Sequence, residues 1–161
     1  MYDPDQLRLL IIRPTLLALG LHSPEAEELM MGTCAQESKG GTYLKQVNGI
    51  AYGAWQMEPT THDDICTRFL PNQPIKCSLM VNHCQIRTKP DAAMMVYHLT
   101  YACAMARLHY FRADGAIPRS LEDQAAYYKR YYNTPKGAAT PEEYITNYEA
   151  FLGKPKKGKG K

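Results

Sequence analysis

The sequence predicts a mostly α-helical single domain with at most a small, irregular β element. Its 161 residues are about one domain's length, and 45% hydrophobic with 22% charged residues is typical of a globular protein. Helix-start signals recur along the chain, and apolar residues at helical spacing follow them. We therefore expect helices over residues 4–20, 24–38, 60–65, 91–112, 121–132 and 141–152.

The first two helices have the clearest beginnings. Asp3 and Ser23 are N-cap residue types, and each precedes a proline at the first helical position. The first helix is rich in leucine, and we expect it to bend or break near Pro14 and to end at Gly20. The second helix should run to about Ser38, because two consecutive glycines follow shortly after.

The middle of the chain is less regular. Residues 42–58 lack a helical period and contain two glycines, which predicts turns and at most short strands. Thr60 and Thr61 are expected to cap a short helix that ends near Ile65. Residues 70–90 hold three prolines and two cysteines, which predicts a long irregular loop.

The last third is helical again, followed by a basic tail. Residues 91–112 are nearly all apolar and predict a long buried helix, Ser120 caps the next helix, and Pro141 opens the last. Five lysines in "GKPKKGKGK" predict a separate tail, residues 153–161, after a domain of residues 1–152. Without the tail, 14 basic residues face 16 acidic ones, so the positive net charge is local and indicates no partner for the domain.

Composition also limits the compartment and the cofactors. The five cysteines are an odd number with no CxxC pair, which favours reduced thiols, although a disulfide formed under oxidising conditions stays open. The spacing of the cysteines with His83 matches no usual zinc-ligand pattern. The acidic N-terminus is unlike a signal peptide, and polar residues interrupt the apolar run 92–111. We expect a soluble protein made in a reducing cytosol, with no membrane span, metal or cofactor.

One glutamate stands where a core residue is expected. At 100° per residue, Glu37 lies about 20° from Ala26, in the middle of the apolar stripe of the second helix. Burial and the negative end of the helix dipole both raise the pKa of a carboxyl group, which is how a general acid is built. On the helix alone, the alternative that the helix has ended and Glu37 faces solvent stays open.

Four short motifs extend this observation. "QES" at 36–38, "YGAWQM" at 52–57, "PTTHDDI" at 59–65 and "AAYYKRYYN" at 125–133 occur in this order. The set resembles the lysozyme-like superfamily, in its soluble lytic transglycosylase and goose-type lysozyme branch, and most closely the small transglycosylase-like proteins of tailed bacteriophages. The resemblance covers roughly residues 25–148 and implies a lysozyme-like domain.

The resemblance implies roles for individual residues. Glu37 would be the catalytic acid, and Ser38 would hydrogen-bond near the acid or the substrate. The other implied residues belong to the sugar cleft: Gln56 and Met57 as lining, Tyr132 orienting the glutamate beside Asn133, and Tyr144 as a later cleft tyrosine.

Two departures from the family pattern limit this assignment. Trp55 stands where an aliphatic residue is commoner, and the late motif reads Tyr-Asn-Thr-Pro-Lys-Gly in place of Tyr-Asn-Ala-Gly. A core position for Trp55 also stays open, as does a purely structural role for the tyrosines of residues 127–132.

The implied chemistry needs one carboxyl group. A lytic transglycosylase uses its acid to protonate the glycosidic oxygen, and the sugar's own 6-hydroxyl then closes a 1,6-anhydro ring. Asp63 and Asp64 are candidates for the second carboxylate of a hydrolysing lysozyme. They follow a helix start, where acidic residues are ordinary, so the single-acid mechanism is favoured.

The expected function is cleavage of the MurNAc-GlcNAc β-1,4 bond of bacterial peptidoglycan by a bacteriophage lytic transglycosylase. The alternative is a structural or adaptor protein of the virion that keeps the lysozyme fold with little or no catalysis. Expected partners are peptidoglycan and other virion proteins, and nucleic acid is not favoured because only the tail suggests it. The expected location is the host cytoplasm on synthesis, and then the virion or the periplasm.

Overall fold

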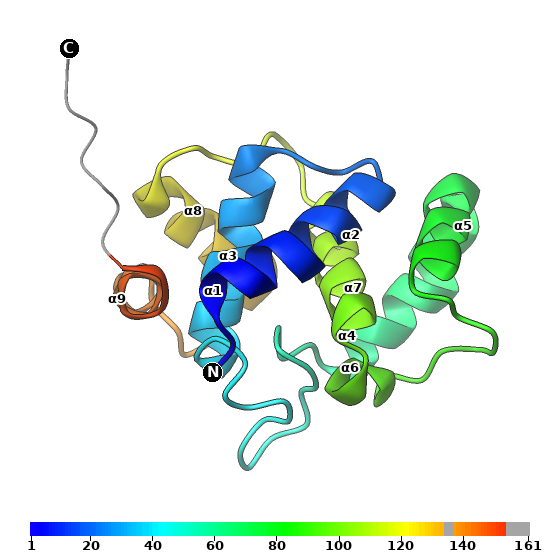
Figure 1. Cartoon of the computed structure of the whole chain (residues 1–161), viewed down its shortest axis with the longest axis horizontal. Coiled ribbons are helices and arrows are strands. Elements are labelled where there is room, and N and C mark those ends of the chain that lie inside the picture. The colour runs from blue at the N-terminus through cyan, green and yellow to red at the C-terminus, as the bar shows by residue number, and fades with distance from the viewer. Residues whose placement is uncertain (134–136, 154–161) are drawn as a thin grey trace.

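Helices supply most of the regular structure in residues 1–133 and 137–153, the part of the chain that the computed structural model describes (Figure 1). The expected mostly α fold is confirmed. Within these residues the β pairing consists of two isolated bridges, Lys45 with Tyr52 and Tyr52 with Met57. The α-helices are α1 (Pro4–Gln6), α2 (Arg13–Ala18), α3 (Pro24–Ser38), α4 (Pro59–Asp64), α5 (Pro74–His83), α6 (Met94–Tyr97), α7 (Leu99–Phe111), α8 (Leu121–Tyr128) and α9 (Pro141–Leu152).

Three α-helices are joined to wider, π-helical turns. Leu7–Ile12 connects α1 to α2, Ile65–Phe69 follows α4, and Lys129–Asn133 follows α8; a short 3₁₀ turn, Leu70–Asn72, leads on toward α5. The first of these turns ends at Ile12, two residues before Pro14, which has no N–H to donate to the preceding turn. The helix nevertheless continues past Pro14 as α2, so of the expected bend or break the break is absent.

The core lies around α3 and α7. Consecutive residues of α3, such as Leu29, Met30 and Met31, are all fully buried, so this helix contacts neighbours on several sides. It packs against α9 and α8 on one side and against α2 and α7 on the other (Figure 1). This burial extends to the last turn of α3, where Glu37 lies.

The long helix expected over residues 91–112 is wrong as a single element. It divides into α6 and α7 at His98, whose backbone leaves the helical region at φ −115° and ψ 85°. The His98 side chain stabilises the break, because its Nδ1 accepts from the Tyr101 amide at 3.2 Å and its Nε2 contacts the Cys84 carbonyl at 2.9 Å. The histidine thus acts as the N-cap of α7.

The irregular loop expected over residues 70–90 is also wrong. Pro74 occupies the first position of α5, where a proline favours a helix, and Met80 on that helix is buried in the core. The threonine cap expected for the preceding helix is likewise absent, because α4 begins at Pro59 and its N-cap position is Glu58.

The C-terminal boundary is described only to Gly153, which follows α9 with φ +81°. The rest of the expected basic tail, residues 154–161, lies outside the described residues. In residues 1–133 and 137–153, no helix is both long and apolar enough to cross a membrane.

Candidate functional site

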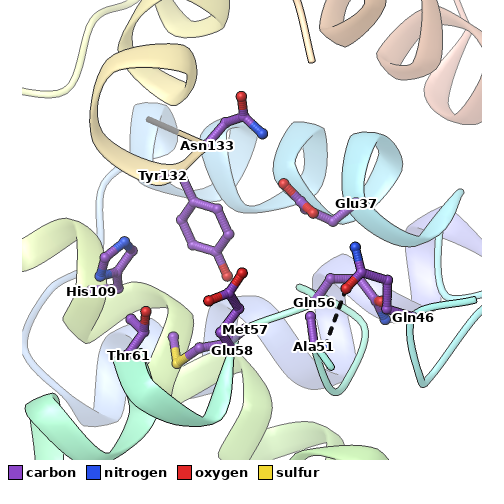
Figure 2. Close-up of a pocket in the computed structure, with 10 residues that line it drawn as sticks. All are labelled: Glu37, Gln46, Ala51, Gln56, Met57, Glu58, Thr61, His109, Tyr132 and Asn133. Carbon is purple, nitrogen blue, oxygen red and sulfur yellow. Dashed lines mark hydrogen bonds between the residues drawn. The ribbon is translucent and has the colours of Figure 1, made fainter. Parts of the chain in front are cut away.

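A cavity of about 310 Å³ opens beside the C-terminal end of α3. Its walls come from α3, the turn segment 42–58, the start of α4, the end of α7 and the π-helical turn after α8 (Figure 2). The lining residues are Glu37, Gln46, Ala51, Gln56, Met57, Glu58, Thr61, His109, Tyr132 and Asn133. Most of these side chains are polar, and the volume is within the range of small-ligand sites.

Glu37 is held in this wall by the way α3 ends. The helix runs to Ser38, and Lys39 then adopts a left-handed conformation with φ 51° and ψ 54°, followed by Gly40. Glu37 therefore still has helical geometry, as its place on the apolar stripe predicts, and it does not extend freely into solvent. Its Oε1 accepts a hydrogen bond of 2.5 Å from the Tyr128 hydroxyl.

The environment of Glu37 favours the protonated carboxyl group. Burial raises its pKa from 4.5 to about 7, and the hydrogen bond from Tyr128 offsets part of this rise. The C-terminal end of the α3 dipole acts in the same direction as burial. Among the described residues, no cation lies within 4.0 Å of this carboxylate. Near neutral pH the group therefore exists in both protonation states, as a general acid and base requires.

Ser38 supports the site from beneath and does not border the cavity. It is fully buried, and its hydroxyl donates to the Ala54 carbonyl at 2.6 Å and accepts from the Gly41 amide at 2.8 Å. These bonds fasten the turn segment to the end of α3. Of the two expected places for its hydrogen bonds, near the acid or at the substrate, burial excludes the second, and Ser38 positions the loop that carries Gln56.

Gln56 and Met57 both line the cavity. Gln56 has a positive φ of 45°, and its amide nitrogen donates to the carbonyls of Gly53 and Tyr43 at 2.6 and 3.0 Å. Because the nitrogen is committed to the backbone, the amide oxygen is the group left for a ligand. Trp55 lies in the core, where its Nε1 donates to the Met30 carbonyl at 2.9 Å, so it offers no face to a sugar.

Tyr132 and Asn133 line the cavity, but the Tyr132 hydroxyl makes no hydrogen bond to Glu37. Its hydroxyl donates to the Trp55 carbonyl at 2.7 Å, and the phenol that contacts Glu37 belongs to Tyr128, four residues earlier. Residues four apart lie on the same helix face, so two tyrosines at this spacing have similar reach. The expected role of Tyr132 is therefore wrong. Tyr128 orients Glu37, and Tyr132 binds the backbone of the turn segment at Trp55.

Tyr144 lies outside the cavity. It is fully buried on α9, with its ring 5.0 Å from that of Tyr128, and its hydroxyl lies 3.4 Å from the Leu29 carbonyl. It supports Tyr128 from behind, so its expected place as a cleft tyrosine is wrong.

The second carboxylate of the cavity is Glu58. Asp63 and Asp64, the expected candidates, do not line it: Asp63 contacts His62 at 2.8 Å, and Asp64 contacts Arg112 at 2.7 Å. Figure 2 shows Glu58 at the start of α4, across the cavity from α3. Its position directly after the Gln56-Met57 pair is the signal in the sequence that points to it.

His109 is a further lining residue that sequence reasoning missed. Burial and the neighbouring Arg112 lower its pKa to about 4, so the imidazole is neutral at physiological pH. Its Nδ1 lies 2.6 Å from the Arg112 guanidinium, which donates to it, and its ring packs edge-on against Tyr132 at 5.0 Å. These contacts make His109 a support for the cavity wall.

The described residues do not form a metal-binding cluster. Among the described residues, no three His, Cys, Asp or Glu side chains are grouped to hold an ion, and the five cysteines are free thiols.

Comparison with family models, with curated proteins and with solved structures gives no match to this chain.

Proposed function

We propose that this protein cleaves the glycan strands of bacterial peptidoglycan, with Glu37 as the single acid and base. The observation that carries the proposal is the Glu37 carboxyl group, which borders an open polar cavity and has a pKa of about 7. The motifs that resemble lytic transglycosylases meet around this same group, because α3, the turn segment and the end of α8 all border it.

The proton would move in two steps. The Tyr128 hydroxyl donates to Oε1, so the acidic proton of neutral Glu37 resides on Oε2. From there it passes to the glycosidic oxygen as the bond to the sugar's anomeric carbon breaks. The resulting carboxylate then accepts the proton of the sugar's 6-hydroxyl, whose oxygen attacks the same carbon and closes the 1,6-anhydro ring.

The remaining lining groups suit a carbohydrate. The amide oxygen of Gln56, the side chains of Gln46 and Asn133, and the Thr61 hydroxyl all border the cavity. They offer neutral hydrogen-bonding groups of the kind that sugar hydroxyls and N-acetyl amides recognise. Glu58 is the residue placed to activate a water molecule should hydrolysis compete with ring closure.

The resemblance to phage proteins sets the proposed context. We infer a bacteriophage protein that reaches the wall from the virion or the periplasm, with other virion proteins as further partners. The non-catalytic adaptor remains the second candidate, favoured by the altered residues after Asn133.

Release of soluble fragments from purified peptidoglycan tests the proposal. The wild-type protein should release them, and Glu37→Gln should release them about 10²–10⁴-fold more slowly, the usual contribution of general acid–base catalysis. Glu58→Gln is the matched control, because it removes a carboxylate from the same cavity and should leave ring closure active. Release by Glu37→Gln at the wild-type rate would refute the proposal, and no release by the folded wild type would favour the adaptor.

A further inference from the structure

A second cavity, of about 430 Å³, lies at the other end of α3. Its walls come from the α2–α3 connection, the first turn of α3, α7 and the loop before α8. The lining residues are Leu21, His22, Ser23, Glu25, Arg107, Gly115, Ala116, Ile117 and Arg119. Glu37 follows Pro24 by thirteen positions of one helix, so this cavity is about 20 Å from the carboxyl group of the first site. It is a separate feature.

Arg107 is the unusual residue of this cavity. Its exposed fraction is 8%, and its only hydrogen bond within the described residues runs from Nε to the Leu21 carbonyl at 3.2 Å. No described carboxylate lies within 4.0 Å of its guanidinium. Arginine is rarely buried without an anionic partner, because removing its charge from water is costly.

The two terminal nitrogens of Arg107 are not fully covered by the protein. Neither terminal nitrogen donates a hydrogen bond to a described residue. Among the described residues, however, every side-chain nitrogen that is fully buried has a hydrogen-bond partner. Each terminal nitrogen therefore keeps some accessible surface, and the cavity is the space that Arg107 lines. A planar guanidinium with free terminal N–H groups is suited to bind a carboxylate through two parallel hydrogen bonds.

The other charges of the cavity favour a ligand with a single negative charge. Arg119 is 91% exposed and pairs with Glu25 at 3.2 Å, which leaves Arg107 as the unpaired charge, and His22 contacts Glu27 at 2.6 Å. The first turn of α3 adds the positive end of a 15-residue helix. Leu21, Ala116 and Ile117 add apolar side chains to the lining.

We propose that this cavity binds an aliphatic carboxylate, such as the C-terminal carboxylate of a peptide, through the Arg107 guanidinium. The carboxylate lies against the terminal nitrogens of Arg107, and the adjoining alkyl group lies against the apolar lining residues Leu21, Ala116 and Ile117. The site is independent of the glycan-cleaving function and stands whether or not that function is correct.

Titration with N-acetylalanine tests the site, because this molecule carries a C-terminal carboxylate next to a methyl group. N-acetylalaninamide is the matched ligand without the charge, and inorganic phosphate is the competing anion. In ¹H–¹⁵N spectra of the full-length protein, the Arg107 Nε–H signal should shift saturably with N-acetylalanine. The amide should cause no such shift, and phosphate should bind at least about tenfold more weakly.

Two variants locate the binding. Arg107→Met replaces the unpaired charge by an apolar side chain of similar length, so it should fold with an equal or higher melting temperature and bind at least about tenfold more weakly. Arg119→Gln alters an exposed arginine that is already paired, and should weaken binding by no more than about threefold.

Several results would overturn the proposal. A shift that does not saturate, or that the amide reproduces, would mean that no carboxylate site exists. Preferred binding of phosphate would replace the assigned ligand. If Arg107→Met failed to fold, the comparison of acid and amide on the wild-type protein would still decide the question.

Discussion

Replacement of Glu37 by glutamine should change how the protein's stability depends on pH. The carboxyl pKa is 4.5 in the unfolded chain and about 7 in the folded protein, so the folded state binds more protons between these pH values. The free energy of unfolding of the wild type therefore falls as pH rises through this window. At 1.36 kcal/mol per pKa unit, Glu37 should cost the folded state roughly 3 kcal/mol at pH 8 relative to pH 4.

The variant should not have this loss, because glutamine is neutral throughout and still offers an oxygen to Tyr128. Urea unfolding followed by circular dichroism at pH 4 and pH 8 measures the effect as the difference between wild type and variant. Relative to the wild type, Glu37→Gln should gain roughly 3 kcal/mol between the two pH values, or about 6–12 °C in melting temperature for a domain of this size. Glu58→Gln controls for the loss of a negative charge from the same cavity. An equal difference at both pH values would show that the Glu37 carboxyl group is well solvated and would refute the reasoning.

The remaining predictions concern the support of the site. Tyr128→Phe removes a hydrogen bond that lowers the pKa of Glu37, so the alkaline limb of the pH–rate profile should move above pH 7; an unchanged limb would separate Tyr128 from the acid. Ser38→Ala should lower the free energy of unfolding by about 1–3 kcal/mol in urea titrations, because buried backbone groups lose their partner; a neutral effect would contradict the anchoring role. Gly32→Ala would place a methyl carbon 2.0 Å from the Tyr144 hydroxyl, so the melting temperature should fall; an unchanged value would mean that α9 shifts freely.

The helices with strong end signals were predicted well from the sequence. Ser23 with Pro24 gives the start of α3, and Pro141 gives the start of α9, because both signals act within the first turn of a helix. The division at His98 was not predictable in the same way. It depends on a contact with Cys84, fourteen residues away along the chain, which local patterns do not report.

The candidate site was predicted in part for a similar reason. Glu37 is placed by the period of one helix, so its position against the core follows from local sequence. Which tyrosine contacts Glu37, Tyr128 or Tyr132, depends on how α8 docks on α3. Local sequence does not decide between them, because residues four apart lie on the same helix face. Glu58 was missed because its role comes from the fold of the turn segment, which brings the start of α4 opposite α3.

Mass analysis of the fragments released from purified peptidoglycan, with wild type and Glu37→Gln run in parallel, tests whether Glu37 drives ring closure. We expect the wild type to yield ends of 1,6-anhydro-N-acetylmuramic acid, lighter by one water than hydrolysis products and resistant to borohydride, and Glu37→Gln to yield almost none. Reducible ends would contradict ring closure and make Glu58 the base for water. Equal fragments from both proteins would contradict the role of Glu37 itself.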